Sequence, residues 1–173
     1  VAWLMMNIFP ADIRDLAEKI IRSYAGQGQK IVVAESCTGG LIAAALTEIP
    51  GSSNVVERGL VSYSNDAKID LLAVSPELLE TKGAVSAEVA EAMAVGALEF
   101  SHADVAVSVT GIAGPGGATP LKPVGLVFLG LATRAGAVFH YTCHFTGDRS
   151  DIRLQSVREA LKLLLTVEGT AVA

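Results

Sequence analysis

The sequence predicts a single three-layer α/β/α domain with a mixed β-sheet. Three observations support this fold class. Apolar strand-like runs alternate with helical segments along the chain, two late strand-like runs are separated by a short turn, and no linker, repeat or low-complexity stretch divides the sequence. The chain of 173 residues fits one domain, and 51% hydrophobic against 18% charged residues indicates a well-buried core.

The first elements frame a short loop. Apolar residues at spacings of three and four predict a helix over residues 11–25, which Gly26 and Gly28 end. Residues 30–34 are typical of a short buried strand, and residues 41–49 predict a helix that stops at Pro50. Residues 35–40 therefore form a loop between a strand and a helix.

The rest of the chain continues the alternation. We expect strands at residues 58–63, 105–109, 124–133 and 138–145, and helices at 67–72, 76–81, 86–100 and 150–167. Residues 64–66 form a turn with capping capacity, and Asp148 or Ser150 caps the last helix. The glycine-rich residues 110–117 form a loop, and the four residues between the last two strands predict an antiparallel hairpin, which makes the sheet mixed.

Charge and cysteine content exclude several classes of protein. The net charge of -5 and the pI of about 5.1 offer no basic surface for nucleic acid, although one phosphate needs only a few donors. Cys37 and Cys143 are interpreted as reduced thiols, since a chain this apolar needs no disulfide. No apolar run approaches the roughly 18 residues of a membrane span, and residues 1–6 lack the basic start of a signal peptide. We expect a cytoplasmic protein that binds neither membrane nor nucleic acid.

Ser36 lies in the loop between the first strand and a glycine-rich helix start. A side chain there is exposed at the carboxyl end of a strand, and free backbone N–H groups can stabilise developing negative charge. Ser36 is therefore a candidate nucleophile, although a serine at this place can equally cap the helix. Cys37 is a rival nucleophile, because a helix N-terminus also lowers the pKa of a thiol, and position alone does not separate the two.

Lys68 falls in the first turn of the helix predicted at residues 67–72. The positive end of the helix dipole and any partial burial both disfavour its charged form, so we expect a lowered pKa and a neutral amine that can act as a general base. Tyr63, at the end of the preceding strand, can share the proton or hold the lysine. Taken singly, most lysines are solvated and most tyrosines pack.

Arg149 precedes the last predicted helix, where a cation is unfavourable unless a bound anion offsets its charge. A substrate phosphate would supply that anion, and the alternative is an ion pair with Asp148 or Asp151. Residues 114–117 can cradle a phosphate or only turn the chain, and they lack the lysine and hydroxyl of an ATP-binding loop. The three histidines show no recognised ligand spacing, so we expect no metal, and His140 and His144 are expected on the polar face of an edge strand.

Six motifs occur together in a fixed order along the chain. They are residues 34–41 (AESCTGGL), Tyr63 with Lys68, residues 82–86 (KGAVS), 109–117 (VTGIAGPGG), 122–125 (KPVG) and 147–149 (GDR). In this order and spacing the chain resembles the CinA C-terminal domain family over residues 10–167, which leaves an N-terminal extension at residues 1–9 and a tail at 168–173. Some family members carry a further N-terminal domain, and this chain looks like the stand-alone form.

The resemblance implies a nicotinamide-nucleotide amidase. Such an enzyme converts nicotinamide mononucleotide and water to nicotinate mononucleotide and ammonia in pyridine-nucleotide salvage, with no cofactor and no metal, and the resemblance also implies a homodimer. The family pattern places the nucleophile on Ser36 and its proton-handling partners on Lys68 and Tyr63. The residues assigned to substrate binding are Cys37, Thr38, Gly39, Gly40, Thr110, Gly111, Ala113, Gly114 and Arg149.

The expected mechanism is attack by Ser36 on the carboxamide carbon, assisted by Lys68 and Tyr63, with an ester intermediate that water opens. Backbone N–H groups near Gly39 and Gly40 are expected to hold the oxyanion. Two alternatives stay open. The chain can be a nucleotide-binding or regulatory module without turnover, or an amidase for another small carboxamide.

Overall fold

The computed structural model describes residues 7–167. Along this part of the chain the elements are α1 (Ala11–Gln27), β1 (Ile31–Glu35), α2 (Leu41–Thr47), the 3₁₀ helix η1 (Ser52–Asn54), β2 (Val56–Val61), α3 (Asn65–Leu72), α4 (Pro76–Lys82), α5 (Ala87–Glu99), β3 (Val105–Gly111), β4 (Leu126–Thr133), β5 (Val138–His144) and α6 (Arg149–Thr166). The predicted extension and tail lie largely outside the described residues.

The five strands form one mixed sheet in the order β2-β1-β3-β4-β5. β1 pairs in parallel with β2 and β3, whereas β3, β4 and β5 pair antiparallel. The predicted hairpin of the last two strands and the mixed sheet are therefore confirmed. Because β1, β2 and β3 run in the same direction, their carboxyl ends lie at the same edge of the sheet.

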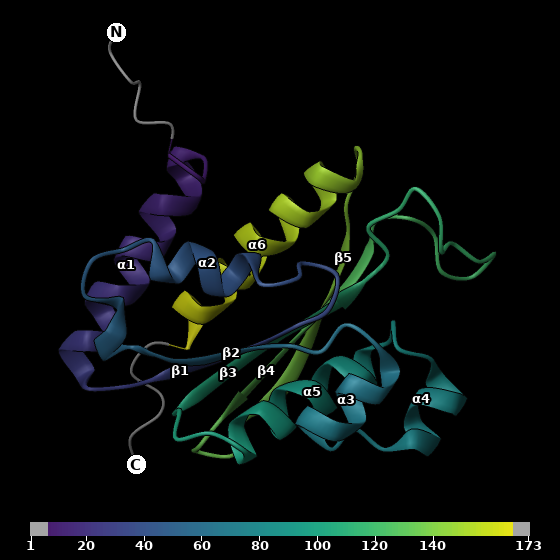
Figure 1. The fold of residues 1–173 in the computed structure, drawn as a ribbon, viewed down its shortest axis with the longest axis horizontal. Coiled ribbons are helices and arrows are strands. Elements are labelled where there is room, and N and C mark those ends of the chain that lie inside the picture. The colour runs from purple at the N-terminus through teal and green to yellow at the C-terminus, as the bar shows by residue number, and fades with distance from the viewer. Residues whose placement is uncertain (1–6, 168–173) are drawn as a thin grey trace, which may run out of the picture.

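Helices cover both faces of the sheet, which gives the three predicted layers (Figure 1). α1, α2 and α6 pack on one face against side chains such as Val33, Val107 and Leu129. α3, α4 and α5 lie on the other face, where Val32 and Ala106 join the second apolar cluster. The alternation of Val32 and Val33 between the two clusters follows from the two-residue period of a strand.

The sequence places most element ends within two residues of those in the structure. The strand predicted at residues 58–63 is displaced, since β2 spans Val56–Val61. Pairing with β1 fixes these ends: Val56 opposes Ile31 and Val61 opposes Glu35, the last residue of β1. The predicted turn at residues 64–66 begins α3, and the Ser64 hydroxyl accepts a hydrogen bond from the Ala67 N–H at 3.0 Å.

One close approach fixes the position of α3. A Cβ added to Gly96 of α5 would lie 1.9 Å from the carbonyl oxygen of Leu72, the last residue of α3. Only glycine fits there without moving a helix. α5 therefore holds the helix that carries Lys68 against the sheet.

No helix within residues 7–167 is both long enough and apolar enough to cross a membrane.

Candidate active site

The candidate site lies at the carboxyl ends of the parallel strands. Ser36 follows β1, Ser62 and Tyr63 follow β2, and residues 112–114 follow β3. The connection from β1 leads to β2 on one side, whereas β3 lies on the other side, so β1 and β3 flank a switch in strand order. In open α/β sheets, ligands bind at this kind of position.

The side chains of Ser36 and Lys68 meet in this position. The Lys68 ammonium nitrogen, Nζ, lies 3.1 Å from Ser36 Oγ. Both side chains are buried, at 9% and 1% exposure. Gly40 is the N-cap residue of α2. The Ser36 hydroxyl therefore does not cap the helix, and its hydrogen bond joins the candidate nucleophile to the candidate base.

Lys68 is surrounded by neutral oxygen acceptors. Besides Ser36 Oγ, its Nζ donates to the carbonyl oxygens of Ser62 at 2.9 Å and Tyr63 at 3.3 Å. None of the ion pairs among residues 7–167 involves Lys68. Burial removes water from the ammonium and lowers the pKa of Lys68 below its usual value, as predicted. The neutral amine that a general base requires is therefore accessible at lower pH than for a solvated lysine.

The rival nucleophile, Cys37, differs from Ser36 in the surroundings and the protonation of its side chain. Its side chain is buried in the core that α1, α2 and α6 cover. Burial raises the pKa of Cys37 to about 12, so the thiol is protonated at neutral pH and the reactive thiolate is scarce. The prediction that the helix N-terminus lowers this pKa is wrong, because removal of the thiol from water outweighs the helix dipole. The structure favours Ser36 over Cys37 as nucleophile.

Glu35 organises the loop between β1 and α2, a role that the sequence analysis did not recognise. Its buried carboxylate accepts hydrogen bonds from the Thr38 hydroxyl at 2.5 Å, the N–H groups of Gly40 and Ile42 at 3.1 Å each, and the Ala43 N–H at 2.9 Å. A carboxylate at a helix N-terminus satisfies unpaired N–H groups and the helix dipole together. The signal for this role in the sequence was a glutamate at the start of the loop that leads into the glycine-rich start of the helix.

In the loop expected to hold an oxyanion, the N–H groups of Gly39 and Gly40 themselves already have hydrogen-bond partners. The Gly39 N–H donates to the Ser36 carbonyl at 3.1 Å, and the Gly40 N–H donates to Glu35. In this structure, neither of these two N–H groups is free for a further acceptor. Within the described chain, the N–H groups of Cys37 and Thr38 donate no hydrogen bond to another residue. These two groups directly follow Ser36.

Tyr63 connects Lys68 to Arg149. Its carbonyl accepts from Lys68, whereas its hydroxyl, on a side chain that is 59% exposed, accepts from Arg149 at 3.1 Å. The Tyr63 hydroxyl therefore lies with Arg149 and not with the amine. Arg149 also donates to the Gly114 carbonyl at 2.9 Å and is the first residue of α6, with Asp148 as the N-cap. No ion pair joins Arg149 to Asp148 or Asp151 among the described residues.

Thr110 and Gly111 shape the end of β3. The Thr110 hydroxyl is buried and donates to the Ala84 carbonyl at 2.7 Å, so it has a structural partner. A Cβ on Gly111 would lie 2.6 Å from a Val127 methyl group. The strand end therefore needs glycine to pack against β4.

A cavity of about 520 Å³ opens beside Arg149. Its lining comes from the β3–β4 connection and the start of α6, and consists of Ala113, Pro115, Val124, Gly147, Asp148, Arg149 and Ser150. Ala113 and Arg149 of the predicted site thus face one cavity, and Gly114 joins them through its carbonyl. The exposed guanidinium of Arg149 suits an anion, whereas the Ser150 and Asp151 N–H groups at the start of α6 already donate to the Asp148 carboxylate.

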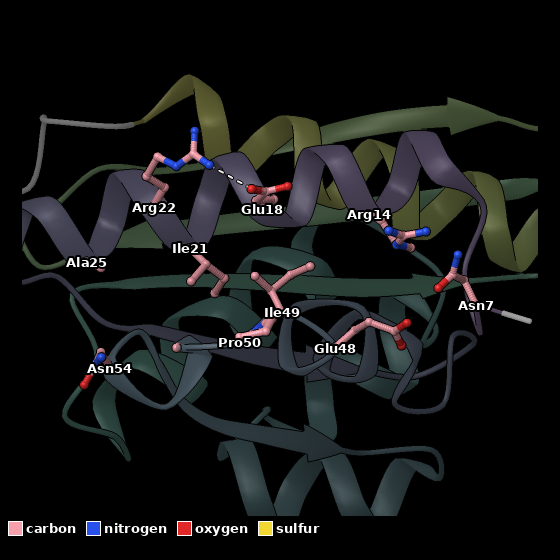
Figure 2. Close-up of a pocket in the computed structure, with 11 residues that line it drawn as sticks. Asn7, Arg14, Glu18, Ile21, Arg22, Ala25, Glu48, Ile49, Pro50 and Asn54 are labelled. Atoms are coloured by element: carbon pink, nitrogen blue, oxygen red, sulfur yellow. Dashed lines mark hydrogen bonds and ion pairs between the residues drawn. The ribbon is translucent and has the colours of Figure 1, made fainter. Parts of the chain in front are cut away.

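A second cavity lies away from these residues, between α1 and the segment after α2 (Figure 2). Its lining includes Arg14, Glu18, Glu48 and Ile49, and no predicted site residue takes part. Of these two cavities, the one beside Arg149 is lined by predicted site residues.

The described residues contain no group of three or more histidine, cysteine or acidic side chains able to hold a metal ion. His140 lies on β5, an edge strand as predicted, and its Nδ1 is 2.7 Å from Glu91 Oε1. Arg153 is a further residue that the sequence analysis missed. It donates to the carbonyl oxygens of Cys37 at 3.2 Å and Thr38 at 2.9 Å.

Comparison with known proteins places the chain among related sequences. A putative competence-damage inducible protein from Caldicellulosiruptor saccharolyticus is 50% identical over 157 residues, which cover 91% of this chain and 38% of that protein. A CinA-like protein from Mycolicibacterium gilvum is 56% identical over 137 residues, 79% of this chain and 32% of that protein. The chain thus spans well under half the length of these two relatives.

Solved structures share the fold over nearly the whole chain. The competence/damage inducible protein CihA from Agrobacterium tumefaciens has a TM-score of 0.92 and 53% identity, covering 94% of this chain and 99% of that one. A CinA superfamily protein from Escherichia coli has a TM-score of 0.87 and 33% identity, covering 94% and 95%. The model of the CinA C-terminal domain matches residues 13–167. The chain therefore belongs to the CinA C-terminal domain family.

Proposed function

We propose that this chain is a nicotinamide-nucleotide amidase that hydrolyses the carboxamide of nicotinamide mononucleotide to nicotinate mononucleotide and ammonia, in pyridine-nucleotide salvage. The observation that carries the proposal is the buried hydrogen bond between Lys68 Nζ and Ser36 Oγ, 3.1 Å long and free of a carboxylate partner. A serine joined to a lysine of lowered pKa is a nucleophile with its own base.

The chemistry follows from this pair. Neutral Lys68 accepts the Ser36 proton while Oγ attacks the carboxamide carbon, which forms a tetrahedral intermediate with a negative oxygen. The intermediate collapses, the C–N bond breaks, and the Lys68 ammonium protonates the leaving nitrogen, which departs as ammonia. Water then attacks the Ser36 ester, Lys68 again takes the proton, and the acid product leaves as Ser36 recovers its hydrogen.

The surroundings of Arg149 support a mononucleotide as substrate. Arg149 is exposed, begins α6 and borders the cavity of about 520 Å³, so a phosphate there would meet a cation. Tyr63 extends from Lys68 to Arg149 through its carbonyl and its hydroxyl. One tyrosine therefore separates the reacting end of the proposed substrate from its phosphate end.

The test is ammonia release by the purified chain from nicotinamide mononucleotide, nicotinamide riboside, nicotinamide and amino-acid amides, with Ser36→Ala as control. We expect the mononucleotide to react fastest and the control to be inactive. Faster turnover of another carboxamide would replace the substrate but keep the amidase. Nucleotide binding without ammonia from any member of the panel would instead indicate a regulatory module.

A further inference from the structure

The two backbone N–H groups that follow the nucleophile belong to peptides whose carbonyl oxygens accept hydrogen bonds, and these bonds fix the orientation of each peptide. The peptide that carries the Cys37 N–H has the carbonyl of Ser36, which accepts a hydrogen bond from Gly39. The peptide that carries the Thr38 N–H has the carbonyl of Cys37, which accepts from Arg153 Nε at 3.2 Å. A trans peptide is planar and its C=O and N–H point in opposite directions, so a bond to the carbonyl fixes the direction of the N–H.

Arg153 holds two successive peptides at once. Its second hydrogen bond, from a terminal nitrogen to the Thr38 carbonyl at 2.9 Å, fixes the peptide that carries the Gly39 N–H. That N–H in turn binds the Ser36 carbonyl and closes the turn behind the nucleophile. The planar guanidinium of one side chain on α6 therefore sets the orientation of the loop on both sides of Thr38.

The positive charge of Arg153 also favours a negative oxygen near the loop, in addition to the orienting effect of its hydrogen bonds. Glu35 places a negative charge under the loop, which disfavours a second negative charge on a substrate oxygen. Arg153 takes part in none of the ion pairs among residues 7–167, so its positive charge is directed at the two carbonyls. A hydrogen bond from a cation polarises a peptide and strengthens its N–H as a donor.

We propose that Arg153 is a positioning residue that aims and polarises the Thr38 N–H, so that this group and the Cys37 N–H bind the oxyanion of the tetrahedral intermediate. The assignment rests on the proposed serine amidase. It places the oxyanion site two residues closer to the nucleophile than Gly39 and Gly40, whose N–H groups are occupied. Arg153 itself does not contact the substrate, since its guanidinium lies behind the peptides whose N–H groups do.

The experiment compares Arg153→Gln and Arg153→Lys with a matched control, Arg158→Gln. Arg158 is half-buried on the same helix but pairs with Asp12 of α1, away from the loop. We expect Arg153→Gln to lower kcat about tenfold to hundredfold with KM unchanged, because loss of one oxyanion donor commonly costs about 100-fold to 1,000-fold and here the donor is only misaligned. Lysine can make one of the two bonds, so Arg153→Lys should lose less, and Arg158→Gln should retain wild-type kcat.

A second measurement does not depend on the natural substrate. A fluorophosphonate labels an active serine: the bond from Ser36 Oγ to phosphorus forms, the P–F bond breaks, fluoride leaves and the serine proton passes to Lys68. The phosphoryl oxygen needs the same donors as a carboxamide oxygen. Labelling of Arg153→Gln should therefore slow by about the same factor as kcat, while circular dichroism and melting temperature show that the variant is folded.

Three outcomes would overturn the assignment. They are wild-type labelling and kcat in Arg153→Gln, a raised KM with unchanged kcat, which would make Arg153 a substrate ligand, and equal losses in Arg158→Gln. Labelled wild type without activity on nicotinamide mononucleotide would reject only that substrate, and the labelling rates would still decide the role of Arg153. Wild type that is never labelled at Ser36 would reject the serine mechanism and this assignment together.

Discussion

Lys68 Nζ and Ser36 Oγ lie 3.1 Å apart, although the two residues belong to different segments of the chain. Ser36 directly follows β1, and Lys68 lies on α3, whose last residue, Leu72, packs closely against Gly96 of α5. The other acceptors around the amine are neutral carbonyls. The ammonium form of Lys68 is poorly solvated there, so the neutral amine is favoured more than it would be in water.

The proposed activity should therefore rise with pH. The base is neutral Lys68, whose fraction grows as pH increases through a pKa that burial has lowered. We expect kcat/KM to climb with pH and to level off below the usual lysine pKa of about 10.4. Lys68→Met should lower kcat far more than it raises KM. A flat profile from about pH 5 to pH 9 would contradict a lysine base.

Ser36→Ala should abolish ammonia release and leave the fold intact, since its side chain is small and its backbone bond to Val109 remains. Cys37→Ala should retain most of the activity, because the buried thiol has a pKa raised to about 12 and only its N–H faces the proposed oxyanion. Steady-state kinetics and circular dichroism of both variants decide the matter. Activity in the serine variant together with its loss in the cysteine variant would reverse the roles.

Glu35→Gln should destabilise the protein by about 2 kcal/mol, since hydrogen bonds to a charged group contribute about 1.5–3 kcal/mol and the amide presents one N–H₂ to backbone donors. The carboxylate now accepts four hydrogen bonds at the start of α2. Glu18→Gln is the control, because Glu18 pairs with Arg22 on the surface and should change stability by less than about 1 kcal/mol. Urea unfolding of both variants gives the two free energies, and equal values would show that Glu35 contributes nothing special.

Much of this site could be predicted from the sequence because its chemistry follows the strand ends. The alternation of strands and helices predicts that Ser36 follows a strand and that Lys68 begins the next helix, and both positions are confirmed. The spacing of residues along the chain does not give the distance between the ends of different strands. The contact of Lys68 with Ser36 therefore rested on resemblance until the fold joined β1 to β2.

Other features depend on contacts that no local pattern reveals. Tyr63 was expected to share the proton or to hold the lysine; its carbonyl accepts from Lys68, whereas its hydroxyl accepts from Arg149. Arg153 lies 115 residues from its acceptor Thr38. The Gly40 N–H is occupied because it donates to the buried carboxylate of Glu35, whose direction the sequence does not specify, and the Gly39 N–H donates to the Ser36 carbonyl.

Arg149→Ala should impair hydrolysis of nicotinamide mononucleotide strongly and change the slow hydrolysis of nicotinamide riboside little, because the proposed contact exists only with the 5′-phosphate. A charge-assisted pair of this kind is among the stronger hydrogen bonds, so KM for the mononucleotide should rise by at least about tenfold. The same side chain also holds Tyr63 and the Gly114 carbonyl, and its loss can loosen the site itself.

Tyr63→Phe separates the two effects, since it removes the hydroxyl that Arg149 holds but leaves the guanidinium in place for phosphate. We expect Tyr63→Phe to affect both substrates alike and only modestly, whereas Arg149→Ala should discriminate between them. Equal losses on both substrates in Arg149→Ala would make the arginine a structural residue, and the phosphate would then have to bind along residues 114–117.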